Sequence, residues 1–590
     1  MKKNDEMANK LKGAFLQVGK ELPSTPPKVQ AAYTSSKIVE SKPNTNGKNS
    51  KKSHRHKSIQ KPRSSRTRNS GGSIFDEAIL SVYKGSNPDR PVSAVKKSRL
   101  PEKSSIELIS GVSFNPAIYP GQALEKIGQK IINELSCATQ QSEFSSTEVQ
   151  LVIGLDLGSS TTKVVIGDPD RKRFFAVPFS PSSDNPYLIS TAIREDFSGD
   201  LIIDTGNDPR IQRNIKLMLM QEDSHQNLGL MAGYIAQIVR YSINWFVAAH
   251  SDEYRGIRFF WNMALGLPVD SVRQQELERR FRLAAIVGAQ CAISTGPIRM
   301  DTVSGTMTKV KLALAEQVLP ENSFSFEEFG TEYGIVAVVP EIAAQVVGLY
   351  KSRRWDTKRP ISFLMDIGAG TVDAAVFSLV DPVGEGAELR FCAFSCAVSE
   401  LGIVNLHLSR IDWLLEKLPQ GMQDREEIVE FLYRLRDLNG YSLTIPSSID
   451  DYVNCVKIVR GEDKSVPDNK YLLELWKKIV GDVLVKGKRK NEINSTWGSL
   501  RTLVAGGGSR SELYARFISS ISSETSFKLQ VEPLEKPENL ETFGLPLNEY
   551  DRLSVAYGLA QGTQWEYLWP EELEDLPRRV KDFSGNYIEK

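Results

Sequence analysis

Cysteine is scarce in this chain of 590 residues. Disulfide-rich secreted domains and zinc modules both require closely spaced cysteine pairs, so scattered cysteines argue against both classes. Cys392 and Cys396 lie close in sequence, but neither a second pair nor a nearby histidine completes a metal site, and burial in a strand is the favoured interpretation. We predict no structural metal. The cysteines are Cys137, Cys291, Cys392, Cys396 and Cys455.

Long apolar runs are also absent. The longest apolar stretch, residues 334–350, is interrupted by Pro340 and Glu341 and is too short and too polar for a bilayer span. The first residues are polar and charged, and they lack the apolar segment of a signal peptide. These features predict a cytoplasmic protein without a membrane span.

The net charge of +1 conceals an uneven distribution. Residues 1–70 contain 17 Lys and Arg but only 4 Asp and Glu, so this part is basic and the remainder is acidic. Residues 1–105 are rich in Lys, Ser, Pro and Asn and cannot bury enough apolar surface to offset the entropy of ordering. We therefore expect a disordered basic N-terminal extension. Such a tail can bind nucleic acid or an acidic membrane surface, or it can serve only as a solubilising or tethering segment, and these interpretations stay open.

One segment of this extension, residues 73–83, has a different pattern. Ser73 and Asp76 form a capping-box pattern, and Phe75 and Tyr83 belong to an apolar helical face. The segment resembles a docking helix for a protein partner. An equal alternative is a helix that packs on the chain's own globular body.

The most informative pattern is a short phrase that occurs twice. Residues 156–163 read Asp-Leu-Gly-Ser-Ser-Thr-Thr-Lys, and residues 366–373 read Asp-Ile-Gly-Ala-Gly-Thr-Val-Asp. Each copy joins two apolar runs rich in β-formers, which predicts strand, tight turn, strand. A third glycine cluster, residues 506–510, also follows an apolar run and precedes a helical pattern.

Turns of this kind have a chemical use. Small residues allow successive backbone N–H groups and hydroxyls to close on a phosphate, while the aspartate at the strand end faces the accompanying metal. Either copy alone could be a plain hairpin. Two copies that face each other would form a phosphate clamp, and the third glycine cluster would let the backbone approach a nucleoside.

These segments resemble the actin and DnaK-type heat-shock ATPase superfamily. The resemblance covers about residues 150–566 and includes five segments in the family's order. It is closest to the nucleotide-binding domain of DnaK-type chaperones. The five segments are the phosphate segments 156–163 and 366–373, the adenosine segment 506–510, and the connecting helices 339–349 and 555–560.

The resemblance implies an α/β protein with a two-lobed actin-like ATPase fold, built from duplicated ribonuclease-H-like domains. An apolar stripe at helical spacing within 123–135 predicts a helix before the first lobe. Helical insertions near 211–250 and 425–486 are expected to form the outer walls of the cleft. The expected parts are the extension 1–105, a helical lead-in 106–148, lobe I 149–355, lobe II 356–566 and a C-terminal tail 567–590.

The resemblance also implies a site for ATP and Mg²⁺, with Asp156 and Asp366 holding the metal. The residues expected around the metal and the attacking water are Asp156, Asp366, Thr371, Asp373 and Glu341. The residues expected to bind ATP are Gly158, Ser159, Ser160, Thr161, Lys163, Gly368, Ala369, Gly370, Gly506, Gly507, Gly508 and Arg510. An alternative for Glu341 is that it only caps the helix that follows Pro340.

Three features qualify the resemblance. The helix expected to contact adenine, with Lys477 or Lys478, matches the family poorly. DnaK-type chaperones carry a lysine that positions the attacking water, but residues 201–210 offer none, and Arg210 is a possible substitute. Only about two dozen residues follow the region of resemblance, which ends near residue 566, so we expect no peptide-binding β-sandwich.

The favoured function is an ATP-binding, slowly hydrolysing, chaperone-like switch whose lobe closure controls a protein partner. The alternative is an ATP-dependent filament protein of the plasmid-segregation type, in which the chain self-assembles. A small-molecule kinase is a third candidate, but no motif for its catalytic base is found. Activator ATPases with a similar first phosphate segment carry a cysteine-ligated cluster, which the scattered cysteines argue against.

Overall fold

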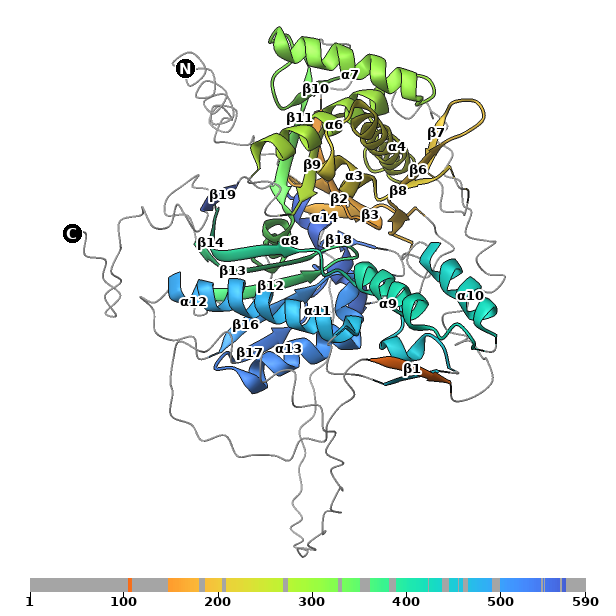
Figure 1. Ribbon diagram of the computed structural model, residues 1–590. Helices are drawn as coiled ribbons and strands as arrows, with labels where there is room; N and C mark the ends of the chain where they lie inside the picture. Colours follow the sequence, from red (N-terminus) through yellow and green to blue (C-terminus); the bar gives the residue numbers. More distant parts are fainter. Residues whose placement is uncertain are drawn as a thin grey trace, which may run out of the picture. The chain divides into compact units, whose positions relative to one another are not determined.

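The structure is a computed structural model (Figure 1). The extension 1–105, including the segment 73–83, lies outside the described residues except for residues 104 and 105. The tail 567–590 also lies outside them except for residues 567 and 568. The structure describes residues 104–108, 147–179, 186–203, 208, 210–268, 274–326, 332–350, 361–380, 389–422, 424–437, 445–454, 456–459, 465–490, 499–542, 545, 547–562 and 565–568.

The described residues form a mixed α/β structure with two large sheets. The first sheet has the order β10-β11-β9-β2-β3-β4-β18, and β5 pairs with β3. Strands β2, β3 and β4 form an antiparallel meander, while β9 runs parallel to β2 and β11 parallel to β9. Its strands are β2 Thr147–Leu157, β3 Thr161–Asp168, β4 Arg173–Ala176, β5 Ile189–Ser190, β9 Ile257–Leu267, β10 Ser323–Ser325, β11 Tyr333–Pro340 and β18 Leu540–Glu541.

The second sheet repeats the central pattern of the first. Its order is β17-β16-β12-β13-β14-β19. Strands β12, β13 and β14 form an antiparallel meander, β16 runs parallel to β12, and β17 runs parallel to β16. Its strands are β12 Ile361–Ile367, β13 Val372–Val380, β14 Leu389–Ser399, β16 Leu500–Ala505, β17 Leu529–Glu532 and β19 Trp565–Leu568.

Helices cover the sheets because the central strands are apolar on both faces. In β2, Leu151 and Ile153 belong to the core shared with α4 and α6, whereas Val152 lies on the opposite face with residues of α14. None of the helices in the described part of the chain is long and apolar enough to cross a bilayer. The α-helices are α3 Ile215–Gln221, α4 His225–Ala249, α6 Gln275–Ile293, α7 Met300–Ala315, α8 Glu341–Tyr350, α9 Ile403–Lys417, α10 Arg425–Asp437, α11 Pro467–Leu475, α12 Lys486–Lys490, α13 Glu512–Glu524 and α14 Ser554–Leu559. A π-helix, η4 Trp476–Val485, connects α11 to α12, and the short 3₁₀ helices are η3 Ile449–Asp451, η5 Gly507–Arg510 and η6 Leu547–Arg552.

Helices α8 and α14 share a core with residues of both large sheets. This core includes Val165 of β3, Leu364 of β12 and Ala556 of α14. The two helices pack very closely. A Cβ atom added to Gly558 of α14 would lie only 1.8 Å from the carbonyl oxygen of Ala344 in α8. Glycine is therefore required at this crossing.

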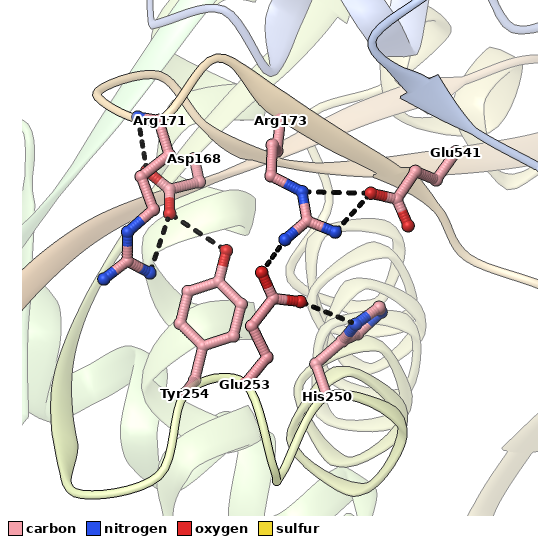
Figure 2. Close-up of polar contacts among 7 residues, drawn as sticks. All are labelled: Asp168, Arg171, Arg173, His250, Glu253, Tyr254 and Glu541. Atoms are coloured by element: carbon pink, nitrogen blue, oxygen red, sulfur yellow. Dashed lines mark hydrogen bonds and ion pairs between the residues drawn. The ribbon is translucent and has the colours of Figure 1, made fainter. Parts of the chain in front are cut away.

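The chain returns from the second sheet to the first at β18, where a polar cluster holds it. Figure 2 shows Arg173 of β4 between the carboxylates of Glu253 and Glu541. In the same cluster the Tyr254 hydroxyl donates to Asp168, at 2.9 Å. Because Asp168 is the last residue of β3, the cluster lies at the opposite end of that strand from Thr161.

Two smaller sheets complete the described structure. Strands β6 Ala192–Glu195, β7 Leu201–Ile203 and β8 Gln212–Arg213 form one, and β1 Ser105–Leu108 pairs with β15 Val456–Val459 in the other. Of the predicted helical lead-in 106–148, residues 106–108 belong to β1 and 147–148 to β2. Residues 109–146, with the helix expected within 123–135, lie outside the described part.

Candidate functional site

The two repeated phrases adopt the same local structure. In the first, β2 ends at Leu157 and β3 begins at Thr161; in the second, β12 ends at Ile367 and β13 begins at Val372. The amide of Gly158 donates to the carbonyl oxygen of Thr161 at 3.2 Å, and the amide of Gly368 donates to that of Thr371 at 2.8 Å. Both are tight turns at the end of a buried strand.

The two turns face each other. A Cβ atom added to Gly370 would lie 3.4 Å from the hydroxyl oxygen of Ser159, so the second turn meets the first at this point. Gly370 itself does not line the adjoining cavity. Its small size instead lets the turns approach.

A cavity of about 540 Å³ opens beside the two turns. Every residue predicted for the ATP and metal site except Gly370 lines it. Contributions therefore come from both sheets and from the third glycine cluster. The lining residues that the sequence did not predict are Leu188, Lys216, Gln345, Ile403, Val404, Ile445, Ser447, Ser511, Asp551, Arg552 and Val555.

Carboxylates concentrate at one side of this cavity. Asp156 pairs with Lys163 at 3.1 Å, and Asp366 accepts a hydrogen bond from Gln345. Burial, together with the negative charges of Glu341 and Asp156, raises the pKa of Asp366 to about 7. A divalent cation here would offset this repulsion, and Mg²⁺ commonly uses one or two carboxylates together with phosphate and water oxygens. The donor set therefore fits Mg²⁺ with a phosphate-bearing ligand.

Lys216 is a cavity-lining lysine that was not predicted from the sequence. It lies on α3, is nearly fully buried, and its Nζ atom lies 2.8 Å from Oε1 of Glu341 at the cavity wall. Arg210, the suggested substitute, instead pairs with Asp208 and lies over the ring of Phe197, and it does not line the cavity. The missed signal was a single lysine within the apolar run 215–220.

Glu341 was predicted either to belong to the metal site or only to cap the helix after Pro340. It is the first residue of α8, directly after Pro340 ends β11. Its carboxylate contacts Lys216, and it lines the cavity. Glu341 can therefore begin the helix and line the cavity at the same time.

The third glycine cluster needs glycine for steric reasons. Gly506 has φ +82°, and a Cβ atom added there would lie 2.2 Å from Oδ1 of Asp366. The cluster continues into η5, where Arg510 pairs with Asp551 at 2.8 Å and with Glu549 at 3.3 Å. Burial raises the pKa of Asp551, while Arg510 acts in the opposite direction. This region forms a charged wall of the cavity.

The start of α9 is hydrogen-bonded to the second turn. The amides of Gly402, Ile403 and Val404 donate to the carbonyl oxygens of Gly370, Gly368 and Ala369, at 3.1, 3.1 and 2.9 Å. These bonds satisfy the turn's carbonyl groups through α9.

The lysines predicted to contact adenine have other partners in the structure. Lys477 pairs with Glu474 and Lys478 with Asp482 on the exposed surface of η4. Neither lysine lines the cavity. The apolar residues of η4 instead pack into the core beneath the second sheet.

The chain was also compared with known proteins. No protein-family model matches it, and no curated protein matches its sequence.

Proposed function

We propose that the protein is an ATP-binding, slowly hydrolysing chaperone-like ATPase switch. The observation that carries the proposal is the pair of equivalent turns, one from each large sheet, which face each other across a single cavity. The repeated strand order of the two sheets supports a two-lobed actin-like fold with ribonuclease-H-like halves. The five segments that resemble DnaK-type ATPases support ATP as the ligand.

The turns would hold the phosphate groups. Backbone N–H groups and the hydroxyls of Ser159 and Thr161 would donate from one side, and Gly368 and Thr371 from the other. Asp156 and Asp366 would hold Mg²⁺. When bound, this ion would offset the negative charge that develops on the phosphate groups during transfer.

Lys216 and Glu341 would orient the hydrolytic reaction. Lys216 would take the role of the lysine that positions the attacking water in DnaK-type chaperones. Its ion pair with Glu341 would hold its side chain in place. Thr371 and Asp373 line the same cavity and would orient the water molecule. Because the residues position a reaction rather than supply a strong base, we propose slow turnover.

Lobe closure would be the output of the switch. A nucleotide that contacts both turns binds better when they are close together, so it favours the closed arrangement by its difference in affinity. The close crossing of α8 and α14 joins the two halves and is the proposed hinge. A protein partner that distinguishes the two arrangements would read the state, and the sparse cysteines suit a cytoplasmic setting.

The test is turnover and assembly of the full-length chain. We expect Mg²⁺-dependent phosphate release from ATP, abolished by EDTA, with no pelleting in either nucleotide state. Reversible pelleting with ATP would favour the alternative of a filament protein. Absence of ATP binding and of phosphate release would refute the proposed function.

A further inference from the structure

One wall of the cavity is formed by a short loop rather than by a helix or strand. Ile445 and Ser447 line the cavity just before the short helix η3 begins. No backbone ladder holds residues 445–447 in place. A side chain from a distant helix donates hydrogen bonds to this loop.

Arg410 of α9 is that side chain. It is fully buried, and its guanidinium donates to the carbonyl oxygen of Pro446 at 2.7 Å and to that of Ser447 at 3.1 Å. Asp468, at the start of α11, balances the charge through two bonds, at 2.6 Å from Nε and 2.9 Å from Nη2. The Tyr452 ring packs 5.9 Å from the guanidinium. Every nitrogen of the guanidinium is thus used.

The same helix contacts both the turn and the loop. Its first residues donate to the second phosphate turn, and Arg410 follows Ile403 by seven positions. At a rise of about 1.5 Å per residue, the two contacts lie about 10 Å apart along the helix. Arg410 therefore fixes a part of the cavity wall away from the phosphate turn.

The chemistry of this position favours arginine. Two carbonyl oxygens and a carboxylate surround it, and the planar guanidinium offers five donors in a fixed arrangement. Lysine has three donors on one atom and cannot reach these acceptors from one position with the same geometry. Without the side chain, the buried carbonyl group of Pro446 and the carbonyl group of Ser447 would lose this donor.

We propose that Arg410 is a positioning residue that holds loop 445–447 as the nucleoside-side wall of the cavity. This inference rests on the proposed function, because it assigns a role within the same site. It predicts that Arg410 affects binding of the nucleoside part of the ligand. It also predicts little effect on binding of the phosphate part.

The test uses the double variant Arg410→Met/Asp468→Leu in the full-length chain. Removing both charges avoids a buried unpaired carboxylate, so folding is preserved better than in a single variant. We expect ATP and ADP to bind about tenfold more weakly. We expect the affinity for magnesium tripolyphosphate, which has no nucleoside, to equal that of the wild type.

Arg240→Met is the matched control. Arg240 is equally buried and donates to the carbonyl oxygens of Cys291, Ala292, Ser294 and Gly296, but it does not line or contact the cavity. Its loss should lower stability and leave the nucleotide affinity of the folded protein unchanged. A matching loss of ATP affinity in this control would show a general effect of destabilisation and overturn the proposal.

Other outcomes separate the two proposals. Wild-type ATP affinity in the folded double variant, or tripolyphosphate binding weakened as much as ATP binding, would overturn the role of Arg410 while leaving the proposed function intact. If the double variant does not fold, Arg410→Lys, which keeps the charge opposite Asp468, replaces it. Undiminished ATP affinity in that variant would equally overturn the role. A wild-type chain that binds no nucleotide would refute both proposals.

Discussion

Replacing Asp366 by asparagine is expected to have opposite effects on stability and on Mg-ATP binding. Burial, with the charges of Glu341 and Asp156, raises the pKa of Asp366 from 3.8 to about 7. Because the folded protein binds this proton more tightly than the unfolded chain does, the metal-free protein loses stability as pH rises from about 4 to about 7. The neutral asparagine removes this penalty.

The size of the effect follows from the shift in pKa. Each pKa unit corresponds to about 1.4 kcal/mol, so full ionisation of Asp366 would cost on the order of 4 kcal/mol. Since the side chain is partly accessible to solvent, we expect about half of that, on the order of 2 kcal/mol. Asp366→Asn should therefore raise the free energy of unfolding in EDTA at pH 8, and this gain should approach zero near pH 4.

The assay compares urea unfolding in EDTA with Mg-ATP binding by calorimetry. We expect greater stability and at least tenfold weaker Mg-ATP binding in the same variant. Asp168→Asn is the matched control, because Asp168 is buried at the other end of β3, where it accepts from Tyr254 and Arg171. That variant should lose stability and retain Mg-ATP binding. A folded Asp366→Asn variant with unchanged Mg-ATP affinity would refute the metal assignment.

Three further predictions concern other parts of the site and the extension. Lys216→Gln should reduce phosphate release about 100-fold with a smaller effect on ATP affinity, and unchanged single-turnover rates would contradict its role. Gly506→Ala should weaken ATP binding at least tenfold, because the new methyl group would meet Asp366 in a backbone at φ +82°. Gly296→Ala, at φ +98° with no atom within 4 Å, is its control and should leave ATP binding unchanged in a titration. Replacing the three Lys and Arg residues within 51–55 by serine should not change ATP affinity, and a large loss would show that the extension reaches the cavity.

The parts of the site that were predictable from the sequence are local. Each of the two repeated turns is a continuous run in which an apolar strand ends near an aspartate, small residues follow, and a second strand begins. The glycine cluster at 506–510 is also a local pattern. The structure agrees with it, because a Cβ atom at Gly506 would clash with Asp366. Hydrophobic patterning and turn chemistry act over a few residues, so one sequence suffices to predict them.

The parts that were missed depend on tertiary packing. Lys216 reaches Glu341 because α3 presents that side chain to the cavity, which residue spacing alone does not reveal. The insertion near 211–250 was expected to form an outer wall, but α4 is buried against the first sheet and contributes to its core. Ile445 and Ser447 line the cavity from a loop that Arg410 of another helix contacts through the carbonyl groups of Pro446 and Ser447. Each of these contacts joins segments far apart in the chain.

The most direct test of the central claim is calorimetric titration of Mg-ATP into the wild-type chain and into Asp156→Asn and Asp366→Asn. If the two turns hold one ligand together, the wild type should bind one Mg-ATP per chain, and each variant should lose most of that binding. Retained binding in either folded variant, or no binding by the wild type, would contradict the claim.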